Sequence, residues 1–210
     1  MKKKIEHPLS ALAQFLPEGS FETVIDYLNK FKVVLTVTNE RKTILGDYRN
    51  ALRDKNHRIS VNGNLNKYSF LITLLHELAH LLTFEQYGNK VFPHGNEWKA
   101  NYSGILVEFV QLNIFPKDIL IQLRKSIQSP SASCGGEVDL MRVLRNYDVQ
   151  KEGFVLVENI PQGQLFADNK GRIFRKGDQV RKRFRCLEIA TGLVYLFHPV
   201  YEVRLIQPND

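Results

Sequence analysis

The chain has 210 residues, of which 43% are apolar, a formal net charge of +7 and a pI near 9.4. This length and apolar content are sufficient for one ordinary globular domain or two small ones. No stretch approaches the roughly 18 consecutive apolar residues that cross a bilayer, which argues against a membrane protein. The positive charge favours an anionic partner without identifying it.

The amino-terminal segment begins with a basic run, MKKK, as a signal peptide does. However, His7, Pro8 and Gln14 interrupt any apolar region, and no small-residue cleavage site follows. The two cysteines, Cys134 and Cys186, are too few for a disulfide framework and form no CxxC pair, although a single disulfide remains open. We therefore predict a cytoplasmic protein.

The first part of the chain predicts alternating helices and strands. Ser20 is placed to cap a helix that runs to about Phe31. Residues 32–38 are rich in β-branched side chains and predict a strand. The segment ILGDYR contains a turn-like Gly46, and residues 57–64 predict a second strand that ends at an Asn-Gly turn.

Residues 71–84, LITLLHELAHLLTF, predict a buried helix that carries a polar stripe. Thr73, His76, Glu77 and His80 share one helical face, because they are spaced by three, four and seven residues. Burying two imidazoles and a carboxylate costs several kcal/mol unless they are paired or bound to metal. The HExxH spacing lets both histidines bind one zinc ion, with Glu77 as the general base that later protonates the leaving amine.

Zinc in a catalytic site needs a third protein ligand, and the best candidate is His94 in PHGNEWK. Glu85 and Glu97 are weaker alternatives. Glu85 follows His80 by five residues, about 140° around the helix. Glu97 follows His94 by three residues and is better placed to hold a ligand in position or to act as a first-turn helix charge.

Other interpretations of this motif stay open. The histidines could be satisfied by hydrogen bonds in a core, or the zinc could be purely structural, although structural sites usually have four protein ligands. His57 and His198 have no motif around them and are read as surface or capping residues. The residues that could donate a hydrogen bond to an oxyanion are Tyr48, Tyr68, Tyr87 and Tyr102, and the sequence does not choose among them.

The rest of the chain changes from helical to β-rich. The residues after His94 predict helices at 97–112, 117–127 and 139–147. The Ser-, Pro- and Gly-rich segment 129–137 is the best domain boundary, and short strands separated by turns follow from Gly153. We therefore predict an α+β fold, with a first domain over residues 1–130 and a second over 131–210, made of a linker helix and a small antiparallel β domain.

The second domain concentrates positive charge. Alternation predicts that Arg181, Arg183 and Arg185 share one strand face while Phe184 and Cys186 share the other. Such a face could contact nucleic-acid phosphates, or it could be a solvated edge that resists aggregation. The residues predicted to bind nucleic acid are Lys170, Arg172, Arg175, Lys182, Arg183 and Arg185.

HELAHLLTF followed by PHGNEWK resembles the SprT-like zinc metallopeptidases, the family that includes Spartan, a protease of DNA-protein crosslinks. The shared pattern is HExxH with a downstream HGxx(W/F). The strands expected from RKTILGDYR and HRISVNGNL also resemble the family, so the resemblance covers about residues 20–110. It implies a zincin-like helical core with a small sheet, His76, His80 and His94 as zinc ligands, and Glu77 as the catalytic base.

The family often carries a C-terminal zinc ribbon with four cysteines. Here only Cys186 stands in a ribbon-like context, so we predict a degenerate ribbon held by apolar packing and one zinc ion per chain. The resemblance implies a zinc-dependent endopeptidase acting on proteins, including DNA-associated or DNA-crosslinked proteins. The alternative is a nucleic-acid-associated, transcription-related regulator or scaffold with a zinc site and little proteolysis.

Overall fold

The computed structural model describes residues 7–41, 44–51, 56–131, 137–149 and 152–206. The chain forms two compact units, residues 1–148 (unit 1) and 149–210 (unit 2). The predicted boundary at 130/131 differs from this division. Helix α5 (Val138–Arg145), expected to be a linker, is part of unit 1, because its Leu140 and Leu144 are buried in that unit's core.

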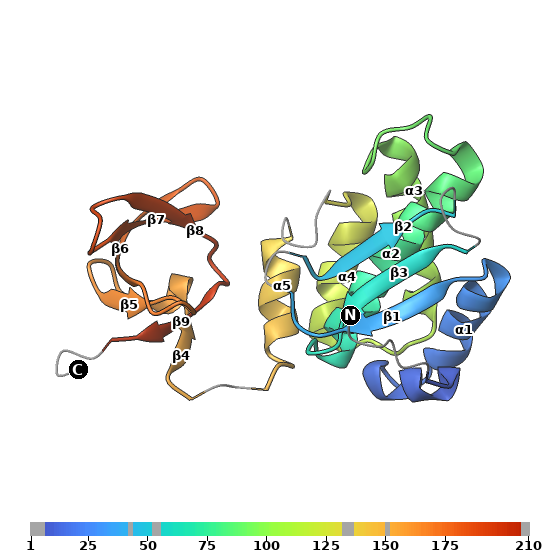
Figure 1. Cartoon of the computed structure of the whole chain (residues 1–210), viewed down its shortest axis with the longest axis horizontal. Helices are drawn as coiled ribbons and strands as arrows, with labels where there is room; N and C mark the ends of the chain where they lie inside the picture. The colour runs from blue at the N-terminus through green and yellow to red at the C-terminus, as the bar shows by residue number, and fades with distance from the viewer. Residues whose placement is uncertain (1–6, 42–43, 52–55, 132–136, 150–151, 207–210) are drawn as a thin grey trace, which may run out of the picture. The chain divides into compact units, whose positions relative to one another are not determined.

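The sheet of unit 1 has three strands in the order β1-β3-β2, so β2 is an edge strand. Strand β1 (Val34–Thr38) runs parallel to β3 (Arg58–Asn62), and β2 (Gly46–Arg49) runs antiparallel to it. Gly46 thus begins a strand, although the residue alone suggested a turn. Figure 1 shows this sheet lying across the helices of the unit.

The predicted motif helix is α2 (Lys67–Tyr87), and it is buried on nearly all sides. Asn66 caps its first turn, because the Asn66 side chain accepts a hydrogen bond from the Ser69 backbone N–H at 2.9 Å. The helix ends at Gly88, whose φ of 62° suits glycine. A mostly aliphatic helix of this kind can be placed only at the centre of a core, which fixes the position of its few polar side chains.

The other helices of unit 1 surround α2 and complete its core. The 3-10 helix η1 (Leu9–Phe15) precedes α1 (Phe21–Lys30). Ser20 occupies the predicted capping position, but its hydroxyl donates to the Pro17 carbonyl instead of accepting from the helix. Helices α3 (Asn96–Gln111) and α4 (Lys117–Gln128) follow the motif, as predicted within about a residue.

Unit 2 is a curled antiparallel sheet with the strand order β4-β9-β5-β6-β7-β8. A short 3-10 helix, η3 (Val157–Asn159), follows its first strand. The strands are β4 (Phe154–Leu156), β5 (Leu165–Ala167), β6 (Ile173–Val180), β7 (Arg183–Glu188), β8 (Val194–Phe197) and β9 (Glu202–Leu205). Buried aromatic and aliphatic side chains, including Phe166 and Phe174, fill its interior together with the free thiol Cys186.

The mixed α+β class predicted from the sequence is confirmed. Within the described ranges, no helix has both the length and the apolar character needed to cross a membrane. Cys134 lies outside the described residues.

Candidate metal and catalytic site

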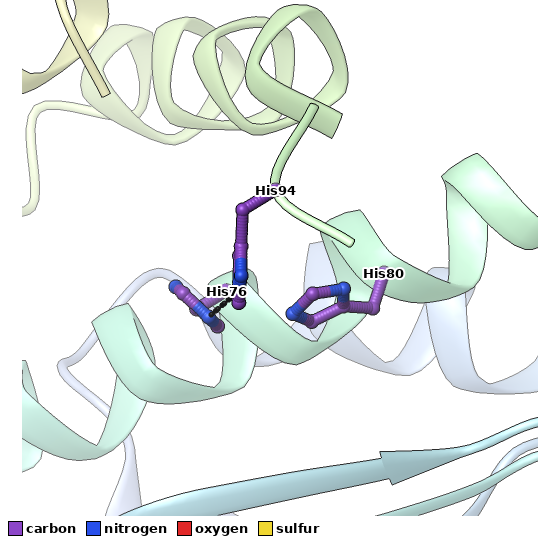
Figure 2. A group of neighbouring side chains, drawn as sticks. All are labelled: His76, His80 and His94. Atoms are coloured by element: carbon purple, nitrogen blue, oxygen red, sulfur yellow. Dashed lines mark hydrogen bonds between the residues drawn. The ribbon is translucent and has the colours of Figure 1, made fainter. Parts of the chain in front are cut away.

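Three histidines from two parts of unit 1 converge on one point. His76 and His80 extend from successive turns of α2, and His94 reaches them from the segment just before α3 (Figure 2). His94 has a φ of 64°, a left-handed conformation that is uncommon for a residue other than glycine. The turn around it is closed by a 2.9 Å hydrogen bond from the Gly95 N–H to the Phe92 carbonyl.

The spacing of the three rings fits one tetrahedral metal ion. One ring nitrogen from each histidine lies within 4.8 Å of the other two, and the Nε2 atoms of His76 and His94 are 3.3 Å apart. Two nitrogens bound to one tetrahedral zinc at its usual bond length are separated by about 3.3 Å. The three residues therefore fit zinc as its protein ligands, and within the described chain they form the one such cluster of His, Cys, Asp or Glu side chains.

Burial keeps these imidazoles in the form that binds metal. Desolvation and the neighbouring histidines lower the pKa of His76 to about 3. The same causes lower the pKa of His80 to about 4, and desolvation also lowers the pKa of His94. Neutral imidazole is the metal-binding form, so little proton displacement opposes metal binding at neutral pH.

Trp98 forms the wall behind the three histidines. Its fully buried ring lies 4.7 Å from the ring centres of both His76 and His94, and 5.3 Å from that of His80. The Tyr102 ring stacks on Trp98 and contacts the ring of His76. These rings restrict the rotation of the histidines, and through Trp98 helix α3 packs onto α2.

Glu77 lies beside the histidines and is only 7% exposed. Desolvation raises its pKa to about 8, and the negative charge of Asp47 adds to this effect, while Arg41 opposes it. A carboxyl group with a raised pKa is suited to accept and return a proton near neutral pH. The structure thus gives Glu77 the environment of a general acid-base residue.

The site opens into a cleft of about 810 Å³ that is lined along one side by β2. Leu45 accepts a hydrogen bond from the Asn62 N–H, and Gly46 is aligned with Val61. Antiparallel pairing alternates, so Gly46 and Tyr48 turn their backbone N–H and C=O groups toward the edge of the sheet, where no other strand of the described residues pairs with β2. That edge faces the cleft and could pair with an extended chain.

A hydrogen-bonded chain that the sequence did not reveal lies next to His80. The Glu85 carboxylate is 3.1 Å from His57 Nε2, and the Tyr48 hydroxyl is 2.9 Å from His57 Nδ1. The Tyr48 ring stacks nearly parallel to His80 at 6.4 Å. The prediction of a surface or capping His57 is therefore wrong, because the residue is buried between these two partners.

The four tyrosines considered as oxyanion donors lie in different parts of unit 1. Tyr48 lines the cleft, and Tyr102 contacts His76 from within the core. Tyr68 packs against Phe115 and Tyr147, away from the histidines, and Tyr87 is exposed at the end of α2.

Comparison with known proteins agrees with this arrangement. Residues 13–116 match the model of the SprT-like family. This part of the chain belongs to the SprT-like family. No match was found among curated proteins or among solved structures. The SprT-like family is often linked to metallopeptidase-like proteins and often associated with zinc, and α2, His94 and β2 all fall inside the matched region.

Glu97 occupies the first turn of α3 in the SprT-like unit. Among the described residues it forms no hydrogen bond or ion pair with the three histidines. Its position agrees with the other predicted role, a negative charge near a helix N-terminus.

The basic residues of unit 2 lie outside the family match and fall into two groups. Arg172 forms an ion pair with Asp168 at 2.8 Å and lies 3.6 Å from Glu188, and the buried Lys176 donates to the carbonyls of Glu158 and Ile160. Internal partners therefore engage these two cations. Arg181 lies in the turn before β7 and not on the strand. Of the basic residues between positions 170 and 185, the exposed ones are Lys170, Arg175, Arg181, Lys182, Arg183 and Arg185.

Gly46 is needed for the close approach of β2 to Glu77. A Cβ atom at this position would lie 2.5 Å from Glu77 Oε1 and 2.8 Å from Thr73 Cγ2. We expect Gly46→Ala to lower the free energy of unfolding by about 1–3 kcal/mol, because the buried neighbours have to move. Urea denaturation followed by circular dichroism measures this change.

A glycine in open space provides the control. A Cβ atom added at Gly104 in α3 would have no neighbouring atom within 4 Å, so Gly104→Ala should raise stability by up to about 1 kcal/mol. Equal stability of Gly46→Ala and the unaltered protein would contradict the close packing of β2 on Glu77.

Proposed function

We propose that the chain is a zinc-dependent endopeptidase that hydrolyses protein substrates. The observation that carries this proposal is the convergence of His76, His80 and His94 beside a buried Glu77, in a cleft bordered by a free strand edge. Membership of residues 13–116 in the SprT-like family supports it.

His76, His80 and His94 would hold zinc through their ring nitrogens, with one zinc ion per chain. When bound, zinc supplies Lewis acidity that activates water and polarises a carbonyl group. Glu77 would accept a proton on a carboxylate oxygen as the water attacks, and then deliver it to the nitrogen of the departing amine. The raised pKa of Glu77 suits both halves of this transfer.

Strand β2 would align the substrate for this reaction. The outward N–H and C=O groups of Gly46 and Tyr48 can pair with an extended polypeptide, and antiparallel pairing is the more stable arrangement. Gly46 also lies directly against Glu77, so the paired segment would pass over the catalytic carboxylate. An extended substrate implies an unfolded or locally open protein.

The decisive experiment compares the unaltered chain with Glu77→Gln, both loaded with zinc. The substrate is an unfolded basic protein, incubated at low salt with and without single-stranded DNA. Cleavage by the unaltered chain but not by Glu77→Gln supports the endopeptidase. Absence of cleavage in all conditions, with one zinc bound per chain, favours the alternative of a nucleic-acid-associated regulator or scaffold.

A role for DNA is a second proposal, and it depends on the exposed arginines of β7. Arg183 and Arg185 both point outward, because the strand alternates between exposed and buried side chains. We propose that this face contacts phosphates and that the substrates include DNA-associated or DNA-crosslinked proteins. The cytoplasmic location stays a prediction.

We expect the double variant Arg183→Glu, Arg185→Glu to bind DNA more weakly and with a shallower dependence on salt. Each lost phosphate contact reduces the slope of log K against log salt by about 0.7–0.9. Fluorescence anisotropy with a labelled single strand at several salt concentrations measures both quantities.

The matched control changes the net charge equally on unit 1. Lys99 and Lys117 lie in the first turns of α3 and α4, where glutamate is well tolerated. Lys99→Glu with Lys117→Glu should keep the affinity and slope closer to those of the unaltered protein. If both double variants behave alike, the β7 face is not a specific DNA contact.

A further inference from the structure

A second cavity, of about 130 Å³, adjoins the catalytic cleft. The two spaces share Leu45, His76 and Met141 in their walls, so they are neighbours at the metal site. An engineered protein cavity of about 150 Å³ is large enough to admit benzene. The space is therefore of a size for one aliphatic side chain.

Helix α5 forms one wall of this cavity through Leu140, Met141 and Leu144. The helix lies beyond residues 13–116, the part of the chain that matches the family. Asn66, the residue that caps α2, holds α5 in place. Its Nδ2 donates to the Leu144 carbonyl at 3.0 Å and to Asp148 Oδ1 at 2.6 Å. The wall is therefore held rigidly to the catalytic helix.

The carboxylates around the cavity are already engaged by the protein. Glu137 accepts hydrogen bonds from the Ser126 hydroxyl and the Ser131 N–H. Asp148 accepts from Asn66. Arg145 also borders the cavity, and its guanidinium lies 3.9 Å from the Asp148 carboxylate. The aliphatic part of the lining consists of Leu45, Leu65, Ile72, Leu140, Met141 and Leu144. Such a lining favours an apolar guest and disfavours a charged one, whose desolvation would not be compensated.

The direction of β2 assigns this cavity to one side of the scissile bond. A substrate antiparallel to β2 runs from the Arg49 end toward the Leu45 end, and the bond to be cleaved lies near Glu77 and Gly46. Leu45 borders the cavity, so the residues that reach it follow the scissile bond.

We propose that this cavity, the α5 pocket, binds the side chain immediately C-terminal to the scissile bond and selects leucine or a residue of similar size. The proposal rests on the proposed endopeptidase function, because a scissile bond exists only if the chain cleaves its substrate. Binding of a peptide to the pocket can nevertheless be measured without catalysis.

Trp98 provides that measurement, because it is the single tryptophan of the chain and contacts the histidines next to the pocket. The peptides Leu-Gly-Gly and Ala-Gly-Gly mimic the amino-terminal end of a product, and each is titrated into the zinc-loaded full chain while Trp98 emission is followed. We expect the leucine peptide to bind about 10- to 100-fold more tightly, from its additional buried carbons. Glu77→Gln should show the same ratio of leucine-peptide affinity to alanine-peptide affinity.

Two variants change the pocket in opposite directions. Ser69→Leu fills it and should remove the preference for leucine over alanine, while Met141→Ala enlarges it and should improve binding of Phe-Gly-Gly relative to Leu-Gly-Gly. Ile121→Ala removes a comparable aliphatic side chain from the exposed face of α4 and should change neither ratio. Cleavage sites mapped by mass spectrometry in an unfolded protein should shift in the same way.

Different outcomes would overturn the α5 pocket and the peptidase. Equal binding of the leucine and alanine peptides, or a preference that Ser69→Leu and Met141→Ala leave unchanged, overturns the α5 pocket even if protein substrates are cleaved. A clear leucine preference that these variants alter, together with no cleavage by the unaltered chain, supports the pocket and overturns the peptidase.

Discussion

Replacing Glu77 by glutamine should reduce the rate of protein cleavage by about 10²- to 10⁴-fold, the range lost when a general base is removed. The amide has nearly the shape of the carboxylate but cannot accept the proton of the attacking water. Because Glu77 is not one of the three converging histidines, zinc binding should remain at one ion per chain. Zinc content and cleavage rate are therefore measured on the same sample.

The control for this variant is Glu22→Gln, which removes the same charge from the exposed first turn of α1. It should cleave as fast as the unaltered protein. If Glu77→Gln cleaves at the rate of this control while zinc is bound, Glu77 is not the base, and the buried carboxyl group needs another explanation.

Replacing His80 by alanine should abolish stable zinc binding. Two imidazoles would remain where catalytic zinc sites use three protein ligands. Loss of a partner that only orients a ligand already costs about 10- to 100-fold in affinity, so loss of a ligand should cost more. Metal analysis after gel filtration should give about one zinc for the unaltered chain and close to none for the variant, with cleavage lost in parallel.

Thermal unfolding gives an independent measure of the same effect. Zinc at 100 times its dissociation constant should stabilise the unaltered protein by about 2.7 kcal/mol, while His80→Ala should show no zinc-dependent shift at that concentration. His7→Ala changes an exposed histidine and should respond as the unaltered protein does. A full zinc shift in His80→Ala would exclude His80 from the metal site.

The sequence predicted the buried helix with His76, Glu77 and His80, and the approach of His94 to it, because their signals are local. His76, Glu77 and His80 lie within one stretch of an apolar helix, and the turn residues Pro93 and Gly95 flank His94. Each feature is set by backbone geometry over a few residues. The convergence of the three rings follows from these local rules and from the packing of Trp98.

The features that the sequence did not predict depend on contacts between distant residues. Gly46 and Asp47 are both uncommon in strands, and pairing with β3 outweighs that local preference. His57 meets Glu85 only after β3 and the end of α2 are brought together. Lys176 is buried because carbonyl groups accept from it, which no count of charges along the chain could show.

The Asn66 side chain forms hydrogen bonds with two helices, α2 and α5. Its oxygen completes the first turn of the helix that carries the histidines, and its nitrogen anchors α5, which follows some seventy residues later. Under the two proposals, chemical reactivity and choice of substrate would reside in separate stretches of the chain that meet at this amide. Substitutions along α5 would then change the selectivity of the protein while the helix that carries His76, Glu77 and His80 stays unaltered, which would favour evolutionary and engineered diversification.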